Sequence, residues 1–191
     1  MTLLIIPARY ASTRFPGKPL AVLGGKTVVQ RVWEQAQKAR GIREVIVATD
    51  DKRIAAEVQG FGGQAELTNA GHPSGTDRCA EVAGRHPEHE LVVNVQGDEP
   101  FIRPEQIEEV LRLLREKHFP IATLARPIDR EEALFSPHVV KVVRGAEEQA
   151  LYFSRQPIPH IRERKREAWL EWGAHLQHLG IYGYRRETLL E

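Results

Sequence analysis

Residues 3–20 read LLIIPARYASTRFPGKPL, an apolar run that passes directly into a stiff, cationic loop. The apolar run predicts a buried strand. Pro16 and Pro19 fix φ and stiffen the loop, while Gly17 permits a positive φ and a close approach of the backbone to a ligand. A rigid loop directly after a buried strand is typical of the ligand sites of α/β proteins.

The cations of this loop indicate its ligand. Arg9, Arg14 and Lys18 occur among two hydroxyl residues and no acid. Because no neighbouring carboxylate neutralises these side chains, we expect them to converge on a polyanion, most simply the triphosphate of a nucleotide. The alternative is a solvated loop whose cations pair with acids elsewhere in the chain.

The composition narrows the class of protein. The 191 residues are enough for one domain, 41% are hydrophobic and 28% charged, and the net charge is +1. This balance gives no argument for nucleic acid or a membrane surface as a partner. We find no apolar run of transmembrane length and no signal-peptide pattern. A single cysteine excludes an internal disulfide, which fits a reducing cytoplasm.

Strand and helix patterns alternate over the first 126 residues. Short apolar runs predict strands, and apolar residues at helical spacing predict the helices between them. This order predicts a mostly parallel sheet with helices on both faces, and with its loops at the carboxyl edge. After the strand at 3–6, we expect strands at 45–48, 65–68, 91–95 and 121–125, and helices at 27–40, 52–59, 76–84 and 104–117, with Thr76 as the N-cap of the third.

The pattern changes after about residue 127. Residues 139–143 and 149–154 predict two antiparallel strands, and residues 178–185 alternate as a strand does. We therefore expect residues of about 127–185 to form an extension that includes a hairpin and returns to the sheet near Ile181.

Acidic residues follow two of the predicted buried strands. Asp98 comes directly after strand 91–95, where a carboxylate is well placed to hold Mg²⁺ against phosphate oxygens. The alternatives for Asp98 are a helix cap and an ion pair with Arg103. Asp50 and Asp51 follow strand 45–48, and we expect them equally as ligand-site residues or as the cap of the next helix.

Three other patterns are interpreted as structural. Residues 24–27, GGKT, lack the first glycine of a phosphate-binding loop and predict a turn with a helix cap. The spacing of His86 and His89 suits a metal pair, but we expect a solvated loop. The charged run at 162–167 interleaves acids with its cations and predicts an exposed face.

Five segments together resemble the 3-deoxy-manno-octulosonate (Kdo) cytidylyltransferase family. The matching segments occur in the same order as in the family, and the match runs from Leu3 to the last residue. The set of five segments is specific to this family. The segments are residues 7–20, 72–78 (HPSGTDR), 94–100 (NVQGDEP), 151–155 (LYFSR) and 178–185 (HLGIYGYR).

The resemblance implies a fold and a reaction. The fold is a Rossmann-like, GT-A-like nucleotidyltransferase domain with a dimerising extension. The reaction is Mg²⁺-dependent transfer of CMP from CTP to the anomeric hydroxyl of Kdo, with release of pyrophosphate, for lipopolysaccharide synthesis in the cytoplasm. The partners would be CTP, Kdo and a second copy of the chain.

The same resemblance assigns roles to residues. Arg9, Lys18 and Asp98 would be catalytic, with Asp98 as the metal ligand. The residues expected to bind the nucleotide are Pro7, Ala8, Arg9, Arg14, Lys18, Ser74, Gly75, Thr76 and Gln96. The residues expected on the Kdo side are Arg78, Gln96, His178 and Tyr182.

One departure from the family pattern leaves alternatives open. The family continues beyond the position of residue 191 with a segment carrying a further aspartate, expected as a second Mg²⁺ ligand, which this sequence lacks. A catalytically silent CTP-binding module is therefore one alternative. A cytidylyltransferase for another sugar acid or for a polyol phosphate is the other.

Overall fold

The computed structural model describes residues 1–11, 15–116, 119–172 and 175–191, which divide into two compact units. The first unit comprises residues 1–122 and 181–191, and the second comprises residues 123–180. Two strands belong to both units, β7 (Ile121–Pro127) and β10 (Leu176–Arg185).

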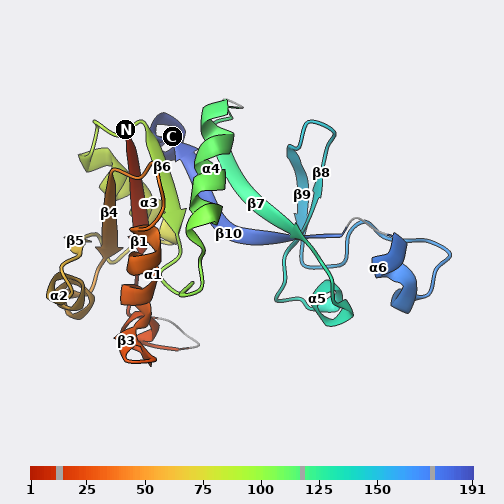
Figure 1. The fold of residues 1–191 in the computed structure, drawn as a ribbon, viewed down its shortest axis with the longest axis horizontal. Coiled ribbons are helices and arrows are strands. Elements are labelled where there is room, and N and C mark those ends of the chain that lie inside the picture. The colour runs from red at the N-terminus through yellow and green to blue at the C-terminus, as the bar shows by residue number, and fades with distance from the viewer. Residues whose placement is uncertain (12–14, 117–118, 173–174) are drawn as a thin grey trace. The chain divides into compact units, whose positions relative to one another are not determined.

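The first unit is built on a parallel sheet (Figure 1). Strands β5, β4, β1 and β6 lie in that order with parallel pairing throughout. The elements of this unit besides β7 and β10 are β1 (Thr2–Pro7), η1 (Lys18–Leu20), β2 (Val22–Leu23), β3 (Lys26–Thr27), α1 (Val28–Ala36), β4 (Glu44–Thr49), α2 (Lys52–Gly60), β5 (Gln64–Leu67), α3 (Gly75–Arg85), β6 (Leu91–Val95), α4 (Pro104–Glu116) and α7 (Arg186–Leu190).

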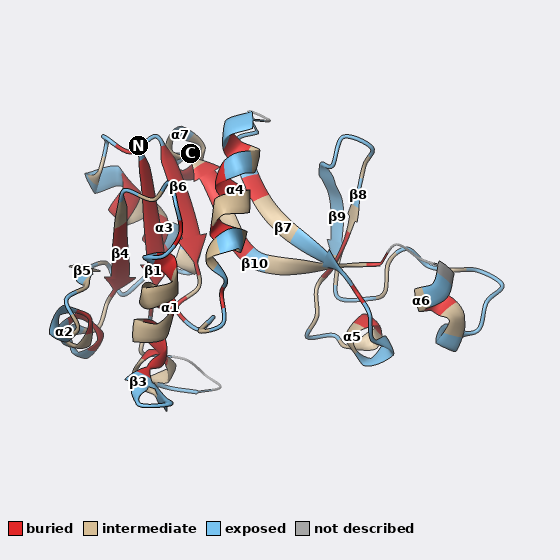
Figure 2. Cartoon of the chain, viewed as in Figure 1, coloured by how far each residue is buried: buried red, intermediate tan, exposed pale blue. Residues whose placement is uncertain are grey.

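Helices cover both faces of this sheet. On one face, α3 packs Cys79 and Val82 against Leu3 and Ile5 of β1. Figure 1 shows α1 and α4 on the opposite face, and Figure 2 shows that β1, β4 and β6 between the layers are buried. The expected fold class, a mostly parallel sheet with helices on both faces, is confirmed.

The strand beside β6 is β10, which runs antiparallel to it. Ile181 pairs with Val95 and Arg185 pairs with Leu91, so the predicted return near Ile181 is confirmed. The strand expected at residues 121–125 is present as β7, but it does not lie beside β6, because β10 takes that place and β7 pairs with β10. Gly183 allows this packing, since a Cβ there would lie 2.4 Å from the Val110 side chain of α4.

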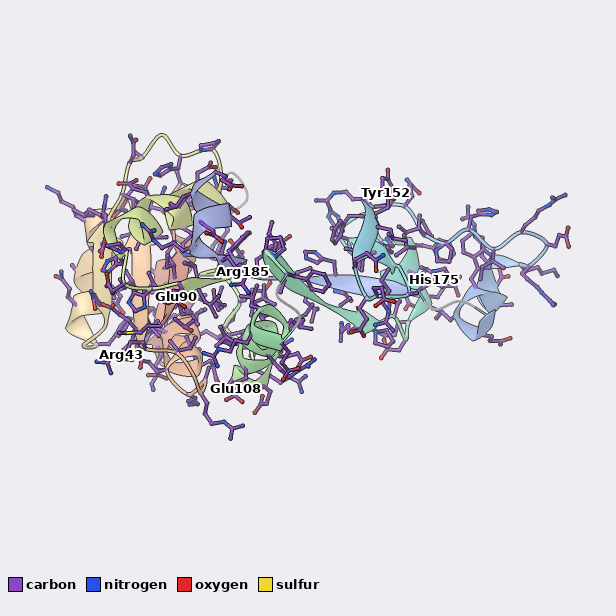
Figure 3. All side chains as sticks on the ribbon, turned by 90° about the horizontal axis from the view of Figure 1, so that it is seen from above. Arg43, Glu90, Glu108, Tyr152, His175 and Arg185 are labelled. Atoms are coloured by element: carbon purple, nitrogen blue, oxygen red, sulfur yellow. The ribbon has the colours of Figure 1, made fainter. Side chains whose placement is uncertain are left out.

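The second unit contains the predicted hairpin. Its elements besides β7 and β10 are α5 (Glu131–Phe135), β8 (Lys141–Arg144), β9 (Ala150–Ser154), η2 (Arg166–Ala168) and α6 (Trp169–Trp172). Strands β8 and β9 pair antiparallel, as expected. A small core forms around Leu134 and Trp169. The ring of His175 stacks on Trp169. Figure 3 labels His175 and also Tyr152 of β9. The charged run 162–167 is exposed, as expected.

One buried cation stabilises this unit. Lys141 is fully buried, and its ammonium group donates to the carbonyl oxygens of Ser136, Val139 and Arg155 at 2.7, 3.0 and 2.8 Å. Burial lowers the pKa of Lys141. The three carbonyls replace the water that this ammonium group loses on folding. They also connect β8 to the chain at Ser136, before the strand, and at Arg155, after β9.

Candidate functional site

Gly97 brings the loop after β6 against the end of β1. Its backbone N–H donates to the carbonyl oxygen of Pro7 at 3.2 Å. A Cβ on residue 97 would lie only 2.8 Å from that oxygen, so a larger residue would push the two loops apart. Glycine at this position therefore sets the place of the following residue, Asp98.

Asp98 contacts the cationic loop directly. The Lys18 ammonium group lies 2.8 Å from the Asp98 carboxylate, and the two side chains are 41% and 50% exposed. An ion pair this exposed contributes on the order of 1 kcal/mol or less. Both groups can therefore exchange this contact for a phosphate or a metal ion at little cost. The alternative of a pair between Asp98 and Arg103 is not found; the partner of Asp98 is Lys18.

The N-terminal end of α3 reaches the same place. A Cβ on Gly75 would lie 3.3 Å from the Pro7 ring and 3.4 Å from the Gln96 side-chain oxygen. Gly75, Gly97 and Gln96 thus converge on Pro7, where three loops meet at the carboxyl edge of the parallel strands. The first backbone N–H groups of an eleven-residue helix are available there to an acceptor.

The N-cap of α3 is Ser74, so the prediction of Thr76 as the cap is wrong. The Ser74 hydroxyl accepts the Asp77 N–H at 3.2 Å, and the Asp77 carboxylate accepts the Ser74 N–H at 3.1 Å. This reciprocal capping box satisfies two backbone donors at once, which Thr76 cannot do. The Thr76 hydroxyl is instead hydrogen-bonded to Tyr184. Burial raises the pKa of Tyr184.

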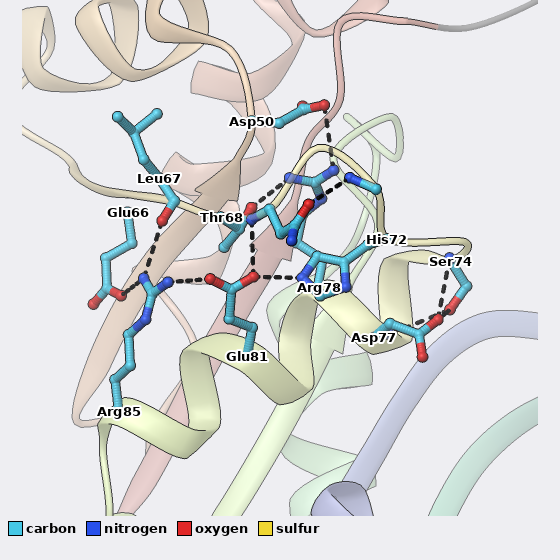
Figure 4. A network of polar contacts seen from close by, with 12 residues as sticks. Asp50, Glu66, Leu67, Thr68, His72, Ser74, Asp77, Arg78, Glu81 and Arg85 are labelled. Atoms are coloured by element: carbon cyan, nitrogen blue, oxygen red, sulfur yellow. Dashed lines mark hydrogen bonds and ion pairs between the residues drawn. The ribbon is translucent and has the colours of Figure 1, made fainter.

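Arg78 lies behind this helix end rather than at its surface (Figure 4). It is 3% exposed, its guanidinium group lies 3.5 Å from the Asp50 carboxylate, and it also bonds the Thr68 hydroxyl. Arg78 thereby joins the ends of β4, β5 and α3. Its expected contact with a sugar carboxylate stays a prediction, and its contacts here are those of a positioning residue.

The loop before α3 is held by the same network. Glu81 of α3 accepts the backbone N–H of Asn69 at 2.9 Å and pairs with both His72 and Arg85 (Figure 4). These bonds, with the Asn69 side chain accepting the Gly71 N–H at 2.7 Å, order the segment that ends at Ser74. The position of the α3 N-terminus is therefore fixed from both sides.

Gln96 and Tyr182 lie on adjacent strands with a buried asparagine. Asn94 of β6 is fully buried, accepts a hydrogen bond from the Gln96 amide at 3.1 Å, and pairs in register with Tyr182 of β10. Its own Nδ2 has no hydrogen-bond partner among the residues that the structure describes. This donor points to a polar ligand or water at this position.

The first loop is anchored at Tyr10. The Tyr10 carbonyl accepts the Gly17 N–H at 2.8 Å, with Gly17 at φ 71°. The guanidinium group of Arg53 lies 3.5 Å from the centre of the Tyr10 ring, and Arg53 also pairs with Asp51 at 2.6 Å. Asp51 is the N-cap of α2. Of the two roles expected for Asp51, a ligand-site residue or a helix cap, the cap is the one observed.

Comparison with known proteins decides the family. The sequence model of the family described as cytidylyltransferase matches residues 3–191. The chain belongs to the cytidylyltransferase family. Two relatives named 3-deoxy-manno-octulosonate cytidylyltransferase are similar to it. The protein of Myxococcus xanthus is 49% identical over 99% of this chain and 74% of its own length, and that of Aliivibrio salmonicida is 54% identical over 95% and 74%.

Solved structures agree with this assignment. A CMP:2-keto-3-deoxy-manno-octonic acid synthetase complexed with CTP superposes with a TM-score of 0.90 at 46% identity, over 98% of this chain and 75% of that one. A cytidylyltransferase of Leptospira borgpetersenii has a TM-score of 0.61 at 18% identity, which shows the fold alone. The chain spans about three quarters of the length of these relatives.

This cytidylyltransferase brings most of its predicted nucleotide-site residues to one edge. Pro7, Ala8 and Gly75 are close-packed there, and Lys18 and Asp98 contact one another. Arg9 is exposed in the same loop, and Arg14 lies outside the described residues. His178 belongs to the second unit, where its ring bonds the Thr123 hydroxyl at 2.9 Å and burial lowers its pKa. Its expected role toward Kdo stays a prediction.

The acidic turn of the cytidylyltransferase suits Mg²⁺. A half-exposed carboxylate on a loop is the type of ligand that Mg²⁺ takes when most of its ligands are water and phosphate oxygens. Glu99 follows Asp98, and its pKa is raised by burial and by the Asp98 charge. Asp98 is therefore the better candidate of the two for an ionised metal ligand.

Two positioning residues, Asn94 and Arg53, were not predicted, and neither was the pairing of Asp50 with Arg78. Asn94 gave a signal, since it is the one polar residue in the run LVVNV, and a lone polar residue in a buried strand needs a partner. The contact of Arg53 with Tyr10 and the pairing of Asp50 with Arg78 gave no signal, because the partners are distant in the sequence.

No helix among the residues that the structure describes is long and apolar enough to span a bilayer.

Proposed function

We propose that this chain transfers CMP from CTP to the anomeric hydroxyl of Kdo and releases pyrophosphate. The observation that carries the proposal is the contact of Gly97 with Pro7, which places Asp98 beside Lys18 under the cationic loop. The likeness to a synthetase solved with CTP, at 46% identity, supports the same substrates.

The reaction needs charge neutralisation and alignment more than a protein nucleophile. The hydroxyl oxygen of Kdo forms a bond to the α-phosphorus as the bond from that phosphorus to the β-phosphate oxygen breaks, and the hydroxyl proton passes to solvent. Arg9, Arg14 and Lys18 would bind the triphosphate and stabilise the charge on the leaving pyrophosphate. Mg²⁺ held by Asp98 would polarise the α-phosphate.

The remaining site residues would orient the two substrates. Backbone groups of Ser74, Gly75 and Thr76 would contact the cytosine, since the Ser74 hydroxyl is already bonded within the capping box. Gln96 and Tyr182 would contact Kdo, beside the Asn94 Nδ2 that has no hydrogen-bond partner among the described residues. Arg78 would act through Asp50, by fixing the end of α3. The role of His178 toward Kdo stays a prediction.

The proposal includes a homodimer. Strand β9 presents three large apolar side chains to solvent, with Leu151, Tyr152 and Phe153 exposed by 61%, 64% and 43%. It pairs only with β8 among the described strands and so leaves one edge open. Exposed apolar edges of this kind are usually covered by a partner. A cytoplasmic location and use of the product in lipopolysaccharide synthesis complete the proposal.

An acceptor panel tests the reaction. Pyrophosphate release is measured with each of CTP and UTP against Kdo, a nine-carbon sugar acid and a polyol phosphate, all with Mg²⁺. We expect turnover with CTP and Kdo at least tenfold faster than with any other pair. Faster turnover with the polyol phosphate would overturn the acceptor assignment, and release with none of the pairs would overturn the reaction.

A further inference from the structure

A cluster of imidazole and carboxylate groups lies at the edge of the sheet opposite the nucleotide site. We call it the histidine–glutamate cluster. Its members are Glu44, His86, Glu88 and His89. Glu44 begins β4, and the six residues of that strand put its two ends about 16 Å apart. Asp50 follows the other end. The expectation that both histidines lie in a solvated loop is wrong, because His89 is 2% exposed.

One ligand atom from each residue faces the other three. These four atoms all lie within 4.8 Å of one another. The Nε2 of His89 lies 3.2 Å from Glu44 and 3.5 Å from Glu88, and the Nδ1 of His86 lies 3.3 Å from the same Glu88 oxygen. The set therefore offers two imidazole nitrogens and two carboxylate oxygens to one point.

These separations match the edges of a metal-centred tetrahedron. Zinc bonds to nitrogen and oxygen are about 2.0–2.2 Å long, which puts neighbouring ligand atoms of a tetrahedron roughly 3.3–3.5 Å apart. The three nitrogen–oxygen separations given above, 3.2, 3.3 and 3.5 Å, fall near that spacing. We propose that the histidine–glutamate cluster binds one divalent transition-metal ion of the zinc class.

An outer carboxylate orients one of the ligands. The other ring nitrogen of His86, Nε2, lies 2.5 Å from Glu66 of β5, and Glu66 is held in turn by Arg85 at 2.9 Å (Figure 4). A metal-bound histidine usually donates its second N–H to a carboxylate in this way, which fixes the tautomer and leaves the first nitrogen free to bind. Burial of His89 fixes the second imidazole.

The donor set selects the metal. Imidazole with carboxylate suits Zn²⁺ and Co²⁺, whereas Mg²⁺ and Ca²⁺ require mainly oxygen ligands. The bound ion would join the start of β4 to the turn between α3 and β6, far from the CTP site. We therefore expect it to stabilise the fold, and this inference does not depend on the proposed reaction.

The test titrates Co²⁺ and then Zn²⁺ into the untagged chain with excess Mg²⁺, which occupies oxygen-only sites such as Asp98. We expect one equivalent of Co²⁺ with the visible absorption of a tetrahedral complex, displaced by Zn²⁺, and a rise in Tm with Zn²⁺. His86→Ala and Glu88→Gln should each weaken binding at least tenfold, and Glu66→Gln by 10- to 100-fold. His138→Ala, an exposed histidine outside the cluster, is the control.

Each outcome decides the proposal. Absence of stoichiometric Co²⁺ binding would overturn it, as would equal binding by the chain and by Glu88→Gln. Glu88 is half exposed, so this variant keeps the fold if His86→Ala does not, and circular dichroism without metal checks both. A matched loss in His138→Ala would equally overturn it, because binding would then not be specific to the cluster.

Discussion

Substitution of Gly97 by alanine tests how the site is assembled. The new Cβ would lie 2.8 Å from the Pro7 carbonyl oxygen, 3.2 Å from the Ala8 Cβ and 3.4 Å from the Ile6 side chain. Ordinary contact begins at about 3.4 Å, so the loop must move by about 0.6 Å from the Pro7 oxygen to reach it. That neighbour is the backbone of a fully buried strand and cannot give way cheaply.

Two effects of known size follow from this movement. Over-packing of this type costs about 1–3 kcal/mol of unfolding free energy. Asp98 follows Gly97 directly, and a displacement approaching 1 Å at a reacting site costs up to about 100-fold in rate. We therefore expect Gly97→Ala to lower the melting temperature by several degrees and kcat by about 10- to 100-fold.

The assay combines thermal unfolding with pyrophosphate release. Gly60→Ala is the matched control, because nothing lies within 4 Å of a Cβ at that position at the end of α2. A glycine-to-alanine change in an unstrained helix adds about 0.4–1 kcal/mol of stability, so this variant should be at least as stable as the chain and equally active. Unchanged stability and activity in Gly97→Ala would refute the reasoning.

Three further predictions concern charge. Asp98→Asn should lower Mg²⁺-dependent turnover at least 100-fold with an unchanged melting temperature, since its carboxylate is half exposed; near-normal turnover would exclude Asp98 as the metal ligand. Arg14→Ala should weaken CTP binding more than CMP binding by calorimetry, because it is assigned to the distal phosphates; equal losses would contradict that role. Arg53 lowers the pKa of Asp51 to about 2, below its unfolded value, so this contribution to stability is present above about pH 4 and lost as the pH falls toward 2. Urea unfolding should therefore show a smaller loss of stability between pH 5 and 3 in Asp51→Asn, and an equal loss would contradict it.

The strands could be predicted because the apolar residues that they bury follow one another in the sequence. Leu91–Val95 is observed at the predicted bounds, and the first strand and the cations after it stand side by side in the sequence. Lys18 and Asp98 could be placed together because the carboxyl ends of parallel strands share one edge.

The remainder depends on partners that are distant in the chain. Arg78 appears available for a substrate until Asp50 and Thr68 are brought around it. His86 and His89 appear solvated until Glu44 and Glu66 arrive from two strands of the sheet. Local sequence patterns cannot predict such pairings, because the two partners come together only when the chain folds into this topology.

The central claim is best tested by ³¹P NMR of the chain with CTP, Mg²⁺ and Kdo. The account predicts that the three CTP resonances decline while pyrophosphate and a single phosphodiester resonance, that of CMP-Kdo, grow in equal amounts. Unchanged CTP resonances over the same period, with CTP shown by calorimetry to be bound, would contradict the proposed transfer.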